Sequence, residues 1–196
     1  RSSGLQVPAR VLDAGASTGG FTQVLLSRGA QLVYAVDVGH GQLAPVVRAD
    51  PRVRVREGLN LRDLTLADLD DEPVDLVVAD VSFILLTLLV GPLASVLASD
   101  GVALLMVKPQ FEAGREKVGK NGVVRDPATH REVLHNAMGY AAANGFKVCG
   151  LDFSPVKGPE GNIEYLMFVQ KSDEPGVLDD SVAEQVVASS HSTLDR

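Results

Sequence analysis

Three charged residues stand in or beside apolar stretches of this sequence, where an isolated charge is strongly unfavourable. Asp80 ends the stretch VDLVVAD, Lys108 ends VALLMVK, and Glu164 lies within the apolar residues 163–169. Buried charges of this kind are expected to find partners or to titrate, which makes them candidates for acid–base chemistry. The strand order of a doubly wound sheet lets Asp80 and Lys108 project into one cleft. A purely structural ion pair is the alternative.

A glycine-rich turn links an apolar stretch to a helical pattern and could hold a polar ligand. The turn reads DAGASTGGF from Asp13 to Phe21, and free N–H groups at the start of the following helix favour polar or negative groups. Its spacing, G-x-x-x-G-G, disfavours NAD and FAD, because Ser17 takes the place of the second glycine of the dinucleotide motif.

Two polar residues that follow later apolar stretches suit a nucleoside. Asp37 could accept hydrogen bonds from both hydroxyls of a ribose, and Asn60 could bind an adenine edge through its amide. The plainer alternatives are that the glycines only shape a tight turn, that Asp37 caps the loop after it, and that Asn60 is a turn residue.

Short apolar stretches alternate with helical patterns along the chain, and this alternation predicts the fold. The stretches are rich in Val and Leu without clean alternation, which is typical of strands covered on both faces. We therefore expect right-handed β-α-β units and an α/β, Rossmann-like, mostly parallel doubly wound sheet of about seven strands. Its ligand site should lie beyond the carboxyl ends of the strands. The expected strands are 10–14, 32–37, 53–55, 74–80, 102–108, 146–151 and 163–169, and the expected helices are 20–28, 43–49, 83–98 and 127–144.

Two further patterns suggest chemistry that their context argues against. Residues 114–120 satisfy most of the P-loop pattern, but Asn121 stands where the magnesium-binding hydroxyl belongs, and the motif does not join a strand directly to a helix. The four histidines lack the spacing of metal ligands, so no metal site is expected.

Composition predicts one globular domain from a reducing compartment. The chain has 196 residues, of which 45% are hydrophobic, enough to bury a core. The single cysteine, Cys149, cannot form an internal disulfide, and a cytoplasmic location is expected. The most apolar stretch, 84–98, is shorter than the roughly 20 residues that cross a bilayer and contains Pro92, so no membrane contact is expected.

The net charge of −7 is unevenly distributed. Residues 172–196 hold six acids and one base, and we expect this acidic tail to form a loose helix or to fray. By contrast, residues 48–62 and 108–131 are basic, and each is either a solvated face or a contact for an anionic partner.

Five motifs, in order along the chain, are similar to those of the FtsJ-like S-adenosylmethionine-dependent methyltransferases. The resemblance covers about residues 10–170 and, within that superfamily, is greatest to the TlyA-type ribosomal RNA 2′-O-methyltransferases, a family often described as haemolysins. Related amine methyltransferases have Asn/Asp-Pro-Pro-aromatic where this chain has Asp80-Val-Ser-Phe83, so the resemblance implies an oxygen acceptor. The motifs are 13–22, 79–84, 107–112, 119–127 and 161–165.

The resemblance implies both a catalytic group and a cofactor site. Asp80, Lys108 and Glu164 match three members of a Lys-Asp-Lys-Glu tetrad, with Lys108 as the base and the two carboxylates positioning it. The first tetrad lysine normally lies upstream of the glycine-rich strand, and no lysine precedes Lys108 here. S-adenosylmethionine would lie on the glycine turn, with its ribose on Asp37 and its adenine near Asn60. The implied cofactor-binding residues are Asp13, Gly15, Ala16, Ser17, Thr18, Gly19, Gly20, Phe21, Asp37, Val38, Asn60 and Asp80.

The resemblance further implies 2′-O-methylation of ribose in ribosomal RNA. The loop from Gln110 to Arg125 would contact RNA phosphates beside the reacting ribose. TlyA-type proteins carry an S4-like RNA-binding domain at the front that is absent from this chain. We therefore expect a methyltransferase domain at 1–171 and the tail at 172–196. The chain alone should bind little RNA and transfer methyl groups poorly or not at all. Competing functions are a catalytically silent RNA-binding module, a nicotinamide-dependent oxidoreductase and a membrane-lytic protein.

Overall fold

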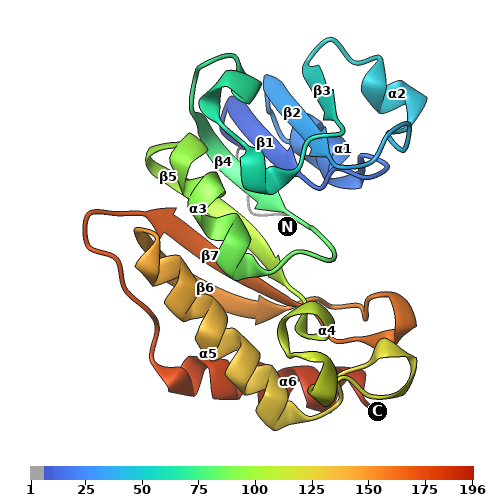
Figure 1. Ribbon diagram of the computed structural model, residues 1–196, viewed down its shortest axis with the longest axis vertical. Coiled ribbons are helices and arrows are strands. Elements are labelled where there is room, and N and C mark those ends of the chain that lie inside the picture. The colour runs from blue at the N-terminus through green and yellow to red at the C-terminus, as the bar shows by residue number, and fades with distance from the viewer. Residues whose placement is uncertain (1–6) are drawn as a thin grey trace.

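Seven strands form one sheet in the computed structural model, which describes residues 7–196 (Figure 1). Their order is β3-β2-β1-β4-β5-β7-β6; β7 pairs antiparallel with both β5 and β6, and the other neighbouring strands of this sheet pair in parallel. The expected Rossmann-like, mostly parallel doubly wound sheet is confirmed. The strands are β1 (Arg10–Ala14), β2 (Leu32–Asp37), β3 (Val53–Glu57), β4 (Val74–Ala79), β5 (Leu97–Val107), β6 (Phe146–Phe153) and β7 (Tyr165–Lys171).

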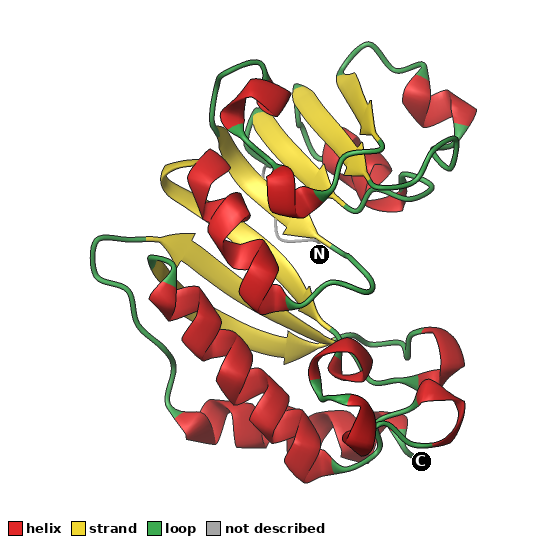
Figure 2. Cartoon of the chain, in the orientation of Figure 1, coloured by secondary structure: helices red, strands yellow, loops and turns green. Residues whose placement is uncertain are grey.

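Helices cover both faces of the sheet (Figure 2). They are α1 (Gly20–Ser27), α2 (Pro45–Arg48), α3 (Leu86–Val96), α4 (Pro109–Glu112), α5 (Pro127–Ala143) and α6 (Asp180–Leu194), with short 3-10 turns at Leu61–Asp63, Leu66–Leu69, Arg115–Lys117, Lys120–Gly122 and Pro159–Gly161. The larger core cluster includes Leu93 of α3, Met138 of α5 and Val187 of α6, and a second cluster holds Leu25 and Leu26 of α1 against the sheet.

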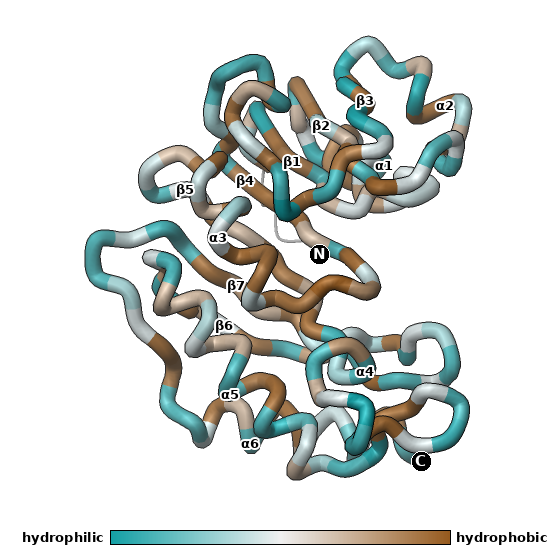
Figure 3. The backbone as a smooth tube through the Cα atoms, viewed as in Figure 1, coloured by the Kyte–Doolittle hydropathy of each residue, from teal (hydrophilic) through white to brown (hydrophobic). Residues whose placement is uncertain are grey.

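Apolar residues gather along the strands, as Figure 3 shows. In β1, the side chains of Val11, Leu12, Asp13 and Ala14 are all buried. A central parallel strand with helices on both sides buries residues of both orientations, so its sequence does not alternate between polar and apolar.

The sheet brings four strand ends to one edge. β1 pairs in parallel with both β2 and β4, and β4 pairs in parallel with β5. The chain passes from β1 outward to β2 and β3, then returns to β4 on the other side of β1. Such a reversal leaves a crevice beyond the carboxyl ends of the central strands. The site should be sought at this edge.

Several predicted boundaries differ from the structure, among them the end of the strand expected at 102–108, which stops at Val107, and three others near the site. The helix expected at 83–98 begins only at Leu86, because Phe83 has φ +63° and Leu85 is extended. β4 ends at Ala79, so Asp80 follows it, and β7 begins at Tyr165, so Glu164 precedes that strand instead of lying inside it. Each carboxylate therefore stands at the edge of the sheet.

The acidic C-terminal segment was expected from the sequence to be loose, but in the structure it is a packed helix. It forms α6, which packs against α5 and β6 and buries Ala183, Val187 and Ser190. The first turn is capped by Asp179, whose side chain accepts a hydrogen bond from Ser181 N at 2.8 Å. Among residues 7–196, no helix is both long and apolar enough to span a membrane.

Candidate active site

The glycine turn lies between three strands and has no room for a side chain at Gly15. That residue follows β1 with φ +83°, and a Cβ built on it would lie 2.2 Å from the backbone oxygen of Asp80. The N–H groups of Gly15 and Ala16 both donate to the carbonyl of Val36, at 2.8 and 3.0 Å. The backbone of the turn is therefore pressed against the ends of β2 and β4.

Asp37 holds the loop after β2 and the glycine turn together. Its Oδ2 accepts a hydrogen bond from Ser17 N at 2.7 Å, and its Oδ1 accepts one from Gly39 N at 2.9 Å. The loop-capping interpretation is therefore correct. Asp37 could still bind ribose hydroxyls as well, because each carboxylate oxygen can accept more than one hydrogen bond.

A cavity of about 630 Å³ opens beside this turn. Asn60 reaches it from the 3-10 turn that it caps, where its side chain accepts a hydrogen bond from Arg62 N at 3.0 Å. The predicted residues Gly15, Ser17, Asp37, Val38 and Asn60 all line this cavity. Apolar walls that the sequence reasoning missed come from Leu61, Val81, Ile84, Leu85 and Leu88.

Most of the remaining predicted cofactor residues line a second hollow, and two of them do not. A shallower hollow of about 390 Å³ on the other side of the turn is lined by Gly15, Ala16, Ser17, Thr18, Gly20, Phe21, Val24 and Asp80. Gly19 lines neither space; it caps α1, and a Cβ there would press on Leu43 and Val47. Asp13 lies beneath the turn and is fully buried.

Asp13 adds a buried carboxyl to the floor of the site. Its Oδ2 accepts a hydrogen bond from Thr22 Oγ1 at 2.7 Å, while its Oδ1 is buried without a partner. Burial, together with the nearby charges of Asp80 and Asp37, raises the pKa of Asp13 to about 6. Three acidic groups therefore lie around the glycine turn; Asp80 is paired with Lys108, and Asp13 and Asp37 favour a cationic ligand.

Lys108 and Asp80 meet as the sequence predicted. They follow the neighbouring strands β5 and β4, and Lys108 Nζ lies 2.5 Å from Asp80 Oδ1. Nζ also donates to Ser82 Oγ at 3.4 Å. The Lys108 side chain is only 12% exposed, so its amine is held close to the carboxylate with little solvent around it. Proton-transfer chemistry at this pair is geometrically possible.

Glu164 does not contact Lys108, contrary to the role expected for it. Among the described residues, no ion pair involves its carboxylate. Instead Glu164 Oε2 accepts a hydrogen bond from Gln110 Nε2 at 3.0 Å. The antiparallel register that pairs Val107 with Tyr165 brings the residues after β5 close to the residue before β7. From the sequence, Gln110 was expected to begin an RNA-contacting loop, and its contact with Glu164 was not predicted; in the structure Gln110 lies in α4.

The short helix α4 connects the two sides of this site. Glu112 Oε1 accepts a hydrogen bond from Leu86 N at 2.9 Å, and burial raises the pKa of Glu112. The ring of Phe111 lies 4.7 Å from that of Phe83, centroid to centroid. Phe83 itself is 89% exposed and lines the 630 Å³ cavity, so an aromatic face is presented at the mouth of the site.

The loop after α4 carries exposed basic residues and has no P-loop geometry. Residues 114–120 contain a 3-10 turn, and α5 begins only at Pro127, as expected from the sequence. Arg115, Lys120 and Arg125 are exposed, while Lys117 pairs with Glu132.

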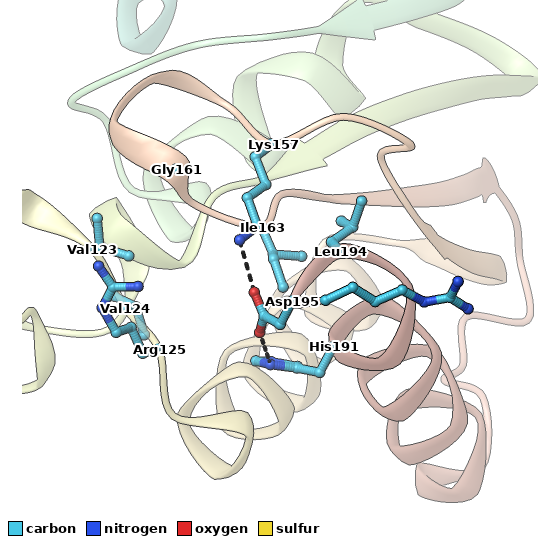
Figure 4. Close-up of a pocket in the computed structure, with 10 residues that line it drawn as sticks. Val123, Val124, Arg125, Lys157, Gly161, Ile163, His191, Leu194 and Asp195 are labelled. Carbon is cyan, nitrogen blue, oxygen red and sulfur yellow. Dashed lines mark hydrogen bonds and ion pairs between the residues drawn. The ribbon is translucent and has the colours of Figure 1, made fainter.

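A chain of polar contacts fixes α6 to α5 and to the loop before Glu164, and Figure 4 shows the part from Lys157 through Asp195 to His191. Lys157 Nζ lies 2.8 Å from Asp195 Oδ1, and Asp195 Oδ2 lies 2.7 Å from His191 Nδ1. His191 Nε2 lies 2.9 Å from the buried His130 Nδ1, which also contacts Tyr165 Oη at 2.9 Å. Burial lowers the pKa of His130. In the described part of the chain, no cluster of His, Cys, Asp and Glu could hold a metal ion.

Comparisons with known proteins agree with this architecture. The FtsJ-like methyltransferase model matches residues 3–171. The 16S/23S rRNA (cytidine-2′-O)-methyltransferase TlyA of Mycobacterium tuberculosis (strain H37Rv) is 47% identical over 161 residues, which make up 82% of this chain and 60% of that protein. Hemolysin A of Brachyspira hyodysenteriae is 43% identical over 164 residues, 83% of this chain and 68% of that protein.

A solved structure is also closely similar. A protein of Streptococcus thermophilus described as a hemolysin superposes with a TM-score of 0.94 at 45% identity, covering 97% of this chain and 70% of that one. The chain thus spans about 60 to 68% of the length of the two curated relatives named above. The family model covers most of the chain and all the motifs at the site, and the chain belongs to the FtsJ-like methyltransferase family.

Proposed function

We propose that this chain is the catalytic part of an S-adenosylmethionine-dependent methyltransferase that modifies the ribose 2′-hydroxyl of ribosomal RNA. The observation that carries the proposal is the Lys108–Asp80 pair, which stands beside the glycine turn at the carboxyl edge of the sheet. The names of the relatives support the substrate: TlyA of M. tuberculosis is named for 2′-O-methylation of cytidine in rRNA.

The residues at the turn fit the cofactor that the family implies. Gly15 lets the turn pack closely against the end of β4 beside the cavity, Asp37 has acceptor capacity for ribose hydroxyls, and Val38 and Leu88 offer apolar walls for a base. The acidic groups around the turn suit the positive sulfonium. When bound there, S-adenosylmethionine supplies an electrophilic methyl group.

Lys108 would act on the acceptor hydroxyl. A lysine accepts a proton only in its uncharged form, so Lys108 must lose a proton before its amine can serve as base. Asp80 then keeps the amine in position and stabilises the charge that Lys108 gains from the hydroxyl.

Two surfaces would hold the RNA. The exposed ring of Phe83 can stack on the base of the reacting nucleotide, since every base has an aromatic face. Arg115, Lys120 and Arg125 in the loop after α4 can contact its phosphates. In this proposal residues 1–171 form the methyltransferase unit, residues 172–196 add α6 to it, and the rRNA substrate implies a cytoplasmic location.

Transfer of a labelled methyl group tests the proposal. The protein, in excess over ribosomal subunits, should move label from S-adenosylmethionine into RNA in a single turnover, and Lys108→Ala should reduce the rate at least a hundredfold while cofactor affinity stays within a few-fold. Asp37→Ala should instead weaken cofactor binding in calorimetry. A catalytically silent RNA-binding module would bind RNA without any transfer, and that result would reject the enzymatic assignment.

A further inference from the structure

Within residues 7–196, the buried carboxylate of Glu164 takes part in no ion pair. Glu164 is only 7% exposed, and the hydrogen bond from Gln110 Nε2 is the one that its carboxylate makes within residues 7–196. On another side it meets the backbone of Gly158, where a Cβ would come within 2.6 Å of its Cδ and Oε1. The position of a buried carboxylate with a single hydrogen-bond donor depends strongly on that donor, here the Gln110 amide.

Gln110 comes from the same turn as Lys108. Pro109 begins α4 between them, and Phe111 N donates to the carbonyl of Lys108 at 3.0 Å, which closes the turn. The side chains of Lys108 and Gln110 leave this turn toward different partners, Asp80 and Glu164. The turn therefore joins two carboxylates that do not touch each other.

The orientation of the Gln110 amide is set by Glu164. With Nε2 directed at the carboxylate, Oε1 is left buried without a partner. The reversed amide would place two acceptor oxygens against each other, which is worse than one unpaired carbonyl. The unpaired Oε1 is thus the consequence of keeping a donor on Glu164.

We propose that Gln110 is a positioning residue for the transfer reaction: it ties Glu164 to the turn that carries Lys108 and so fixes the distance between this carboxylate and the amine. The inference rests on the function proposed above. It predicts that Gln110 affects turnover only through Glu164.

Replacing the amide by an apolar group of similar length gives a direct test. Gln110→Met should lower kcat for RNA about 10- to 100-fold, with the Kd for S-adenosylmethionine within twofold of the wild type. Gln170→Met is the matched control, because Gln170 also donates a single hydrogen bond, to Asp100 O at 3.2 Å, but on an exposed part of β7. It should leave kcat unchanged.

A double-mutant cycle distinguishes positioning from independent effects. If Gln110 acts through Glu164, adding Gln110→Met to Glu164→Met, which removes the acceptor, should cost less than a further twofold in kcat. Multiplicative losses would overturn the inference, as would wild-type kcat in Gln110→Met.

An NMR measurement that needs neither cofactor nor RNA separates this inference from the proposed function. The side-chain amide resonance of Gln110, identified by its loss in Gln110→Met, should shift in Glu164→Gln and stay unchanged in Gln170→Met. Failure of the wild type to methylate RNA that it binds would reject the proposed function and with it a role in that reaction. An amide resonance that ignores Glu164→Gln would reject the Gln110–Glu164 contact itself, whatever the activity.

Discussion

On one side of the site, backbone N–H groups hold the glycine turn and Asp37 in place, whereas on the other side the functional side chains hold one another. Gly15 and Ala16 donate to Val36 O, and Ser17 N donates to Asp37. Opposite them, Lys108 pairs with Asp80 through side chains alone. Backbone-built structure is insensitive to many side-chain changes, while a side-chain network loses function when a single member is replaced.

The largest expected effect comes from a substitution on the backbone side. Gly15→Ala places a Cβ 2.2 Å from Asp80 O and forces alanine to a φ of +83°. We expect a loss of roughly 2–5 kcal/mol in unfolding free energy and a loss of cofactor binding. Denaturant unfolding and calorimetry measure both.

Gly29→Ala is the control for Gly15→Ala. Gly29 has φ +103° but nothing within 4 Å of its Cβ position, so it should cost only the backbone term, about 1–2 kcal/mol, without affecting the cofactor. Equal effects of the two substitutions would show that the close approach at Gly15 has no importance.

The next largest effect is on the pH dependence of stability and comes from Asp13, the carboxyl group buried beneath the glycine turn. Burial raises the pKa of Asp13 to about 6 in the folded protein, from 3.8 when unfolded. Between about pH 4 and 6 the folded state therefore holds a proton that the unfolded state has lost, and the free energy of unfolding falls as the pH rises through this range. Asp13→Asn should therefore raise the unfolding free energy at pH 7 by about 1–3 kcal/mol and leave it little changed at pH 3.5.

Asp75→Asn, on an exposed position of β4, should show no such pH-dependent gain. A stabilisation by Asp13→Asn that is the same at both pH values would contradict the titration of Asp13. Loss of cofactor affinity in the stabilised variant would indicate that the buried charge serves binding at the expense of stability.

The smallest effect on the unfolding free energy is expected where the functional side chains hold one another, next to Glu164. Gly158→Ala meets the end of the Glu164 side chain, and Gly158 has φ −70°, so alanine meets no backbone strain. The carboxylate should move, lowering kcat about tenfold at a cost near 1 kcal/mol in stability. Thermal unfolding and single-turnover transfer test this. If stability falls as far as in Gly15→Ala, the two sides are not built differently.

The difference between the two sides also explains what could be predicted from the sequence. The glycine turn is contiguous, and Ser17 in place of a glycine is visible in its spacing, so the turn and the strand-end Asp37 were located correctly. Asp80 and Lys108 could be paired because neighbouring parallel strands end together.

The contact of Gln110 with Glu164 could not be predicted in this way. These residues are 54 apart in sequence, and they meet because β7 inserts antiparallel between β5 and β6 in a register that pairs Val107 with Tyr165. No periodicity encodes that register. The packing of α6 was missed for a related reason: its acidic surface suggested a tail, while Val187 and Ser190 are buried by contacts with distant elements.

The position of the transferred methyl group tests the central claim most directly. RNA labelled by this protein from methyl-labelled S-adenosylmethionine should be hydrolysed in alkali, since a free 2′-hydroxyl is needed for strand cleavage. The account predicts that the label remains in alkali-resistant dinucleotides, and that Lys108→Ala yields none. Label recovered in single nucleotides, as from methylation of a base, would contradict it.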